Sequence, residues 1–284
     1  MSTLNVQGLR REARSYARAL TIAGSDSGGG AGIQADLKTF SALGCYGMSV
    51  ITALTAQNTV AVRGIHPVPP AFIEEQMDAV LGDIGVDAVK IGMLHSAAVI
   101  RAVAGKLRQH GIGQVVLDPV MVAKSGDRLL QDEAVEELRA TLVPLARVIT
   151  PNLPEAGTLL GRAVETVDQM EEAARELLDL GPEAVIVKGG HLAGGKSADC
   201  LAVGAAADVE IRWLEAERVD TLNTHGTGCT FSSAICSFLA RGASLTDAAE
   251  EAKRYLSEAI RRGAPFRLGE GHGPVHHFYH VWSD

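Results

Sequence analysis

The chain alternates short runs of β-branched and other apolar residues with amphipathic stretches, starting near residue 19. Almost continuously apolar strands are typical of a parallel sheet that helices cover on both faces. The expected strands lie at residues 19–23, 46–54, 88–91, 114–117, 147–150 and 184–188. The expected helices lie near residues 31–43, 71–84, 96–110, 131–141, 154–160 and 167–180. This alternation predicts an α/β fold with a central, mostly parallel sheet.

The rhythm changes after residue 190. Residues 198–203 and 209–214 flank a turn of small residues and predict a hairpin at the edge of the sheet. Two more helices are expected at about 227–241 and 246–262, the second with Thr246 as its N-cap. Because no repeat or low-complexity linker interrupts the chain, we expect residues 19–284 to form a single domain, with residues 1–18 as an N-terminal extension.

Composition excludes several classes of protein. A hydrophobic share of 46% and a charged share of 21% can build a buried core, which argues against disorder. The formal net charge of −8 lacks the basic footprint of a nucleic-acid-binding protein. No apolar run is long enough to span a membrane, and residues 1–18 lack the apolar core of a secretory signal. The four cysteines form no CxxC pair and indicate reduced thiols in a cytoplasmic protein.

Glycine and polar residues concentrate just after the expected strands. In open α/β sheets the ligand lies beyond the carboxyl ends of the strands. These segments are residues 24–32, 56–58, 92–94, 118–120, 151–155 and 188–191. We therefore expect a substrate cleft at this edge of the sheet.

Two glycine-rich segments invite nucleotide-binding interpretations that their contexts do not favour. The loop 24–32 opens a helix, but a dinucleotide site needs an acidic residue at the end of the second strand, and residues 54–58 have none. We therefore favour a loop whose backbone, together with Asp26, approaches a small ligand closely, over a dinucleotide site. Residues 190–197 match the P-loop pattern GxxxxGK[ST], but a strand rather than a helix is expected after Ser197. A chance match is the favoured interpretation.

Residues 223–230 give a stronger signal, because small residues there precede a predicted helix. Unpaired N–H groups and the helix dipole at such a terminus stabilise a transferring phosphoryl group. Cys229 in the first turn would have a lowered pKa. An ordinary capped helix with a buried cysteine is the alternative.

Residues 272–280 contain four histidines. We interpret this segment as a packed C-terminal tail rather than as a metal site.

Nine segments match one known pattern in the same order. They are residues 19–26, 29–40, 56–58, 90–94, 117–121, 150–156, 188–191, 223–229 and 271–278. The chain thereby resembles the bacterial hydroxymethylpyrimidine/phosphomethylpyrimidine kinases of thiamine biosynthesis, in the ribokinase-like superfamily. The resemblance implies a three-layer αβα sandwich. Residues 26–28 read Asp-Ser-Gly where the family more usually has Asp-Pro-Ser, and both suit a turn.

The resemblance also implies an activity. The family transfers the γ-phosphate of ATP, with Mg²⁺, to 4-amino-5-hydroxymethyl-2-methylpyrimidine and then to its monophosphate. Pyridoxal kinase on the same fold is the alternative, and a catalytically silent binding protein is a more distant one. The carboxamide of Gln57 favours an aminopyrimidine, because it offers a donor beside an acceptor. A homodimer is expected from the resemblance alone.

Roles follow from the resemblance, position by position. The substrate side comprises Gly24, Asp26, Gln57, Met93 and Val120, although core packing would equally explain the last two. The ATP side comprises Asn152, Lys188 and Thr224. Asp118 and Glu155 are expected near Mg²⁺, whereas without the resemblance they read as helix-start residues. Gly226, Thr227, Gly228 and Cys229 form the expected anion hole, with Cys229 as the base. Residues 124–128 are expected to act as a flap.

Overall fold

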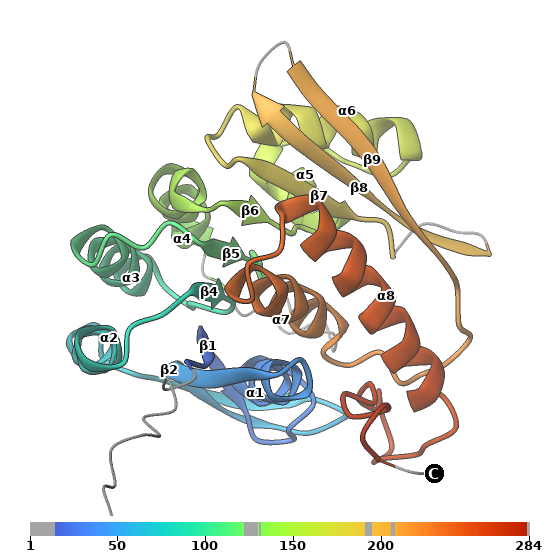
Figure 1. Ribbon diagram of the computed structural model, residues 1–284, viewed down its shortest axis with the longest axis horizontal. Coiled ribbons are helices and arrows are strands. Elements are labelled where there is room, and N and C mark those ends of the chain that lie inside the picture. The colour runs from blue at the N-terminus through green and yellow to red at the C-terminus, as the bar shows by residue number, and fades with distance from the viewer. Residues whose placement is uncertain (1–14, 122–129, 131, 191–194, 206–207, 283–284) are drawn as a thin grey trace, which may run out of the picture.

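The computed structural model describes residues 15–121, 130, 132–190, 195–205 and 208–282. Within these residues the strands pair into a single sheet, in the order β3-β2-β1-β4-β5-β6-β7-β8-β9 (Figure 1). The strands are β1 (Ala17–Asp26), β2 (Cys45–Gln57), β3 (Val62–Pro67), β4 (Ala88–Ile91), β5 (Val115–Leu117), β6 (Val148–Ile149), β7 (Ala184–Lys188), β8 (Lys196–Ala205) and β9 (Asp208–Glu217). Strands β2, β1, β4, β5, β6 and β7 run parallel, which confirms the predicted centre of the sheet.

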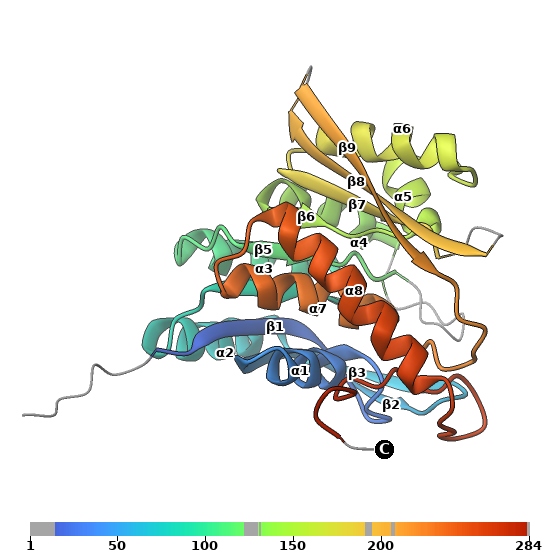
Figure 2. The same cartoon turned by 45° about the vertical axis from the view of Figure 1, so that its right-hand side comes forward.

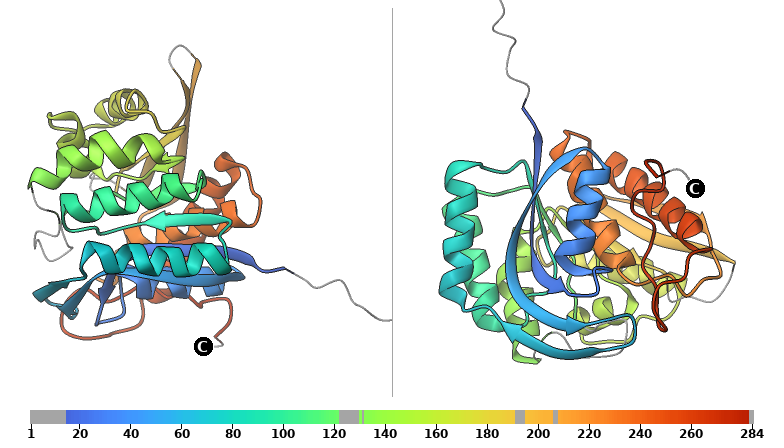
Figure 3. Two further views of the ribbon diagram at one scale, coloured as in Figure 1. Left: turned by 90° about the vertical axis from the view of Figure 1, so that its left-hand side faces the viewer. Right: turned by 90° about the horizontal axis from the view of Figure 1, so that it is seen from below.

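Helices cover both faces of the sheet, so that the molecule has three layers (Figures 2 and 3). One layer comprises α1 (Gly32–Ala42), α7 (Thr227–Ala240) and α8 (Leu245–Gly263). The other comprises α2 (Pro70–Asp83), α3 (Ala97–Gln109), α4 (Asp132–Glu137), α5 (Leu153–Leu160) and α6 (Val167–Leu178). A π turn (Leu138–Leu142) continues α4. The predicted αβα sandwich is therefore confirmed.

The central strands are largely apolar because each face of the sheet has its own core. In β1, Leu20 and Ile22 pack into the larger core beneath α2 and α3. Ala19 points to the opposite face, where Phe40 of α1 and Phe231 of α7 belong to the second core. All of these side chains are at most 1% exposed. Burial on both faces removes the polar alternation of a one-sided sheet.

The predicted edge hairpin forms, as β8 and β9, and is longer than expected at both ends. Sequence reasoning missed β3, which pairs antiparallel with β2 at the other edge. Its residues are partly or fully exposed, so no apolar run marks it. The match at residues 190–197 is not a P-loop, because Lys196 and Ser197 lie in β8 and no helix begins there.

Two predicted boundaries were wrong. Helix α8 is capped by Ser244 rather than Thr246: the Ser244 Oγ accepts a hydrogen bond of 3.1 Å from the Asp247 N–H. Thr246 already lies in the first turn. Strand β1 begins at Ala17, inside the expected extension, where Arg18 pairs with Asp87 at 2.7 Å. Among the described residues, no helix is long and apolar enough to cross a membrane.

Candidate active site

A cavity of about 640 Å³ opens at the carboxyl ends of the parallel strands. Every residue that the sequence analysis named individually as catalytic, substrate-binding, ATP-binding or metal-binding lines this cavity. They are Gly24, Asp26, Gln57, Met93, Asp118, Val120, Asn152, Glu155, Lys188, Thr224, Gly226, Thr227, Gly228 and Cys229. The predicted flap and His191 lie outside the described residues. The cleft is thus where the strand order predicts it.

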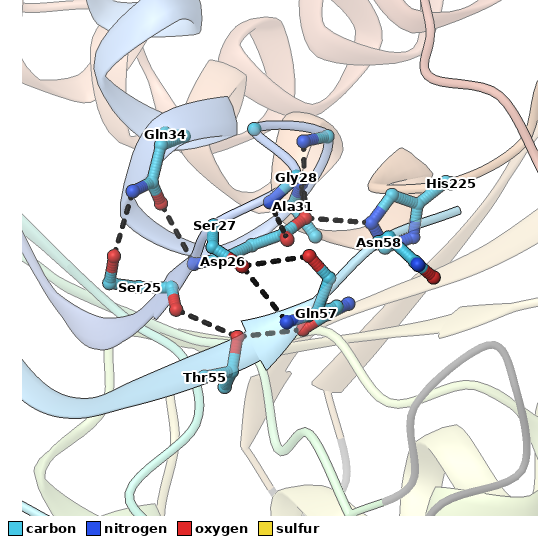
Figure 4. Close-up of polar contacts among 12 residues, drawn as sticks. Ser25, Asp26, Ser27, Gly28, Ala31, Gln34, Thr55, Gln57, Asn58 and His225 are labelled. Carbon is cyan, nitrogen blue, oxygen red and sulfur yellow. Dashed lines mark hydrogen bonds and ion pairs between the residues drawn. The ribbon is translucent and has the colours of Figure 1, made fainter. Parts of the chain in front are cut away.

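Asp26 ends β1 and organises the loop that follows. Its Oδ1 accepts a hydrogen bond from the Gly28 N–H at 2.7 Å, and its Oδ2 accepts from Gly30 at 3.1 Å and Ala31 at 2.9 Å (Figure 4). The His225 Nε2 lies 2.8 Å from the same Oδ2. Burial alone would raise the pKa of Asp26, but the His225 and backbone hydrogen bonds outweigh it and hold this pKa below its usual range. Asp26 is therefore an ionised carboxylate with its oxygens engaged inside the protein.

The Asp26–His225 contact joins the β1–α1 loop to the start of α7. Gly226, the N-cap of α7, has φ +80, a left-handed conformation that favours glycine. A Cβ there would collide with the Gly30 carbonyl oxygen, and a Cβ on Gly30 would collide with the His225 ring. The two loops therefore pack backbone against backbone, and small residues are required on both sides.

The N-terminus of α7 has the features of an anion-binding site. No side chain caps it, and no acidic residue lies in its first turn. Gly228 faces Asp118 and Lys188, since a Cβ placed on it would lie 3.5 Å from both side chains. The first-turn N–H groups and the helix dipole can therefore receive negative charge next to an ammonium group.

Cys229 is half-buried at the cavity wall. The expectation of a lowered thiol pKa was wrong. Burial raises the pKa of Cys229 to about 11, and the nearby Lys90 charge and the Gly32 N–H oppose this only in part. Desolvation of a thiolate therefore outweighs the helix dipole here, and Cys229 is a thiol at neutral pH.

Asp118, Glu155 and Lys188 form a buried charge cluster beside this helix. The Lys188 Nζ lies 2.7 Å from the Asp118 Oδ1 and 3.9 Å from the Glu155 Oε2. Burial raises the pKa of Glu155 to about 7, although the Lys188 charge lowers it. Burial lowers the pKa of Lys188, but the two carboxylates outweigh this and leave that pKa raised. Lys188 thus stays charged at the cavity wall.

Asn152 and Glu155 also have a local role, as the helix-start interpretation anticipated for Glu155. They form a capping box at α5: the Asn152 Oδ1 accepts from the Glu155 N–H at 2.9 Å, and the Glu155 Oε2 accepts from the Asn152 N–H at 2.7 Å. One oxygen of each side chain is therefore used inside the protein. Both residues still line the cavity.

An apolar wall also lines the cavity. Met93 and Val120 pack with Ala53 and Ile65 in a small cluster separate from the two main cores. Gly24 leaves room for Met93, because a Cβ there would lie 2.9 Å from the methionine sulfur. At the rim of this wall, the Gln57 Oε1 accepts a hydrogen bond from Thr55 at 3.1 Å (Figure 4). A flat ring with a polar edge would fit between these groups.

The histidine-rich tail packs against the loop that precedes α7, as the packed-tail interpretation predicts. The Gly273 carbonyl accepts from the His225 N–H at 3.0 Å. His277 is buried, with its Nε2 3.1 Å from the Thr230 Oγ1, and burial lowers its pKa to about 3. His272 and His280 contact carbonyl groups of Leu222 and Ala42 instead.

Sequence reasoning missed two lysines that line the cavity. Lys90 lies in β4 and Lys253 in α8, and each pairs with a buried aspartate. Lys90 was visible as a charge inside an otherwise apolar strand. Lys253 had no comparable signal, because an amphipathic helix carries lysines as a matter of course.

Comparison with known proteins agrees with this geometry. The phosphomethylpyrimidine kinase family model matches residues 26–276. The hydroxymethylpyrimidine/phosphomethylpyrimidine kinase of Rhizobium meliloti is 52% identical over 94% of this chain and 98% of its own. The thiamine biosynthesis bifunctional protein ThiED of Geobacter sulfurreducens is 55% identical over 91% of this chain, which spans only 51% of that protein.

A solved structure is similar as well. The pyridoxal kinase of Bacillus subtilis, determined as an ADP complex, superposes with a TM-score of 0.84 and 42% identity, over 93% of this chain and 98% of that one. The family match, the length of the alignments and the residues gathered around the cavity lead to one assignment. The chain belongs to the phosphomethylpyrimidine kinase family.

Proposed function

We propose that this protein transfers the γ-phosphate of ATP to the hydroxymethyl group of 4-amino-5-hydroxymethyl-2-methylpyrimidine, and then phosphorylates the monophosphate to the diphosphate used in thiamine biosynthesis. One observation carries the proposal. A single cavity joins an apolar wall edged by Gln57 to an uncapped helix N-terminus that bears Cys229, with Lys188 beside it.

In the first transfer, the minor thiolate form of Cys229, whose pKa is about 11, accepts the proton of the substrate hydroxyl. That oxygen forms a bond to the γ-phosphorus while the bond to the bridging oxygen breaks, and its electron pair leaves with ADP. Negative charge develops on the transferring group, where the N–H groups of α7 and the Lys188 ammonium stabilise it. In the second transfer the nucleophile is a phosphate oxygen, already largely ionised near neutral pH.

Asp118 and Glu155 are the residues proposed to hold Mg²⁺. They offer two buried carboxylates next to the lysine that faces the phosphates. Mg²⁺ is usually bound through one or two carboxylates, substrate phosphates and several waters, so this donor set fits. The bound ion would neutralise charge on the β- and γ-phosphates.

Pyridoxal kinase activity is the second candidate, favoured by the similarity to the Bacillus subtilis enzyme. Gln57 argues for the pyrimidine, because its carboxamide pairs with an exocyclic amine and a neighbouring ring nitrogen at the same time. We also propose that the protein forms a homodimer, as the resemblance implies; light scattering measures this. We further propose a cytoplasmic location, in which the four free thiols would stay reduced.

The test offers the purified protein ATP and Mg²⁺ with either hydroxymethylpyrimidine or pyridoxal, and measures ADP formation and product mass. Two successive phosphate additions to the pyrimidine, with poor turnover of pyridoxal, are expected. A Gln57→Leu variant should raise the KM for the pyrimidine much more than that for ATP. Turnover of pyridoxal alone would contradict the proposal.

A further inference from the structure

A charged network lies inside the protein below the helix that bears Cys229. Lys90 of β4 is fully buried, and its Nζ lies 2.9 and 2.8 Å from the two carboxylate oxygens of Asp36 in α1. Asp36 also accepts hydrogen bonds of 2.6 Å from the hydroxyl groups of Thr21 and Ser233. Three side chains, from β1, β4 and α7, therefore share the carboxylate of Asp36.

This network is connected to the active site in two ways. Ser233 lies one turn after Cys229 in α7, so its hydrogen bond to Asp36 fixes the turn that carries the thiol. Lys90 itself lines the same cavity as Cys229. Gly92 leaves space for it, because a Cβ there would lie 2.8 Å from the Lys90 Nζ.

Stability does not account for such a pair. Removing two charges from water is costly, and well-packed apolar residues in their place are often neutral or stabilising. The charges that act on the Cys229 thiolate include Lys90, which favours it, and Asp36 and Asp118, which oppose it. The Lys188 ammonium also favours the thiolate. Burial lowers the pKa of Lys90, but the anions around it outweigh this and raise it, so Lys90 remains an ammonium.

We propose that Lys90 is a positioning residue that acts through Cys229: its ammonium, held by Asp36 beneath α7, favours the ionised thiolate that takes the substrate proton. The inference rests on the proposed base role of Cys229. Burial raises the pKa of Cys229 to about 11, and the nearby Lys90 cation and the Gly32 N–H keep this pKa from rising further, so that a minor thiolate fraction can form. Lys90 and Asp36 thereby have a function in the reaction without touching the substrate.

Alkylation of the thiol tests this without any substrate. The rate at which iodoacetamide modifies Cys229 is followed as a function of pH by peptide mass spectrometry, in the full chain. Lys90→Met should raise the apparent thiol pKa by about one unit, which lowers alkylation near pH 8 about tenfold. Lys253→Met is the matched control, because Lys253 is also buried against an aspartate, Asp199, at 2.8 Å in the same cavity. It should leave the thiol pKa unchanged.

The double variant Lys90→Met/Asp36→Asn serves if the single variant does not fold. It removes both charges and keeps one amide oxygen as an acceptor for one of the two hydroxyl groups, which donate to different oxygens of Asp36 in the wild type. Because Asp36 opposes the thiolate, the double variant is compared with Asp36→Asn alone. A higher thiol pKa in the double variant supports the inference, and equal values overturn it. The base role itself fails separately, if Cys229→Ala slows both phosphorylations equally while Lys90→Met still shifts the alkylation profile.

Discussion

Asp26 shows how the hydrogen bonds of one side chain can organise the loops of a site. It accepts three backbone hydrogen bonds and the contact from His225, and it is 3% exposed. The sequence analysis placed it on the substrate side of the cleft. The hydrogen bonds of Asp26 instead indicate a residue that sets the distance between the β1–α1 loop and the anion hole. Substitution of Asp26 tests this assignment.

Asp26→Asn should destabilise the protein by about 2–4 kcal/mol at pH 7, because an amide cannot accept from all four donors and leaves some of them buried and unpaired. The folded pKa of Asp26 is lowered, so its contribution is present above the unfolded value near 3.9 and lost as the pH falls through the folded value. Urea unfolding between pH 7 and pH 3 measures this. The difference between wild type and variant should shrink toward pH 3.

Asp87→Asn provides the matched control, since Asp87 also has a lowered pKa and pairs with Arg18, but at a partly exposed site. It should cost less than about 1 kcal/mol at pH 7. An Asp26→Asn variant as stable as Asp87→Asn would refute the organising role.

At the scale of elements, the start of α7 depends on contacts with segments far away in the chain. Gly226 packs on Gly30, the Gly273 carbonyl accepts from the His225 N–H, and Thr230 contacts His277. The helix N-terminus is thus held between the first loop and the C-terminal tail. Small shifts in either neighbour should therefore reach the anion hole.

Gly226→Ala should lower turnover about 100-fold or more, because the added methyl group pushes the Gly30 carbonyl away and displaces the anion hole. Gly242→Ala is the control at the other end of α7. Its φ is also positive, at +87, but no atom lies within 4 Å of the added Cβ. It should cost about 1–2 kcal/mol in stability and leave kcat unchanged. Equal kinetic effects of the two substitutions would show that backbone strain alone is responsible.

At the scale of the whole molecule, most of the architecture was predictable from the chain. The buried parallel strands are apolar on both faces, so their sequence differs clearly from the helices around them. β3 was not predictable, because an exposed edge strand has no such signal. The residues after each strand were predicted to meet because parallel strands share one edge.

The electrostatics of the site were less predictable than its location. The sequence placed Cys229 at a helix start but gave no account of its desolvation or of Lys90, so the direction of its pKa shift was wrong. Glu155 illustrates the same limit. Its capping role follows from the spacing to Asn152, whereas its raised pKa depends on burial and on Asp118, which follows β5. These pKa values depend on the balance between burial and charges from distant parts of the chain. That balance can be determined only from the folded structure.

The most direct test of the account measures the two phosphorylations separately in wild type and Cys229→Ala. An alcohol needs a base, whereas the monophosphate, with a second pKa of about 6, does not. Cys229→Ala should therefore slow the first step about 100-fold or more and the second only slightly. In wild type, the first step should also accelerate as the pH rises from 7 toward the thiol pKa of about 11. Equal losses in both steps would contradict the account and leave Cys229 no role as a base.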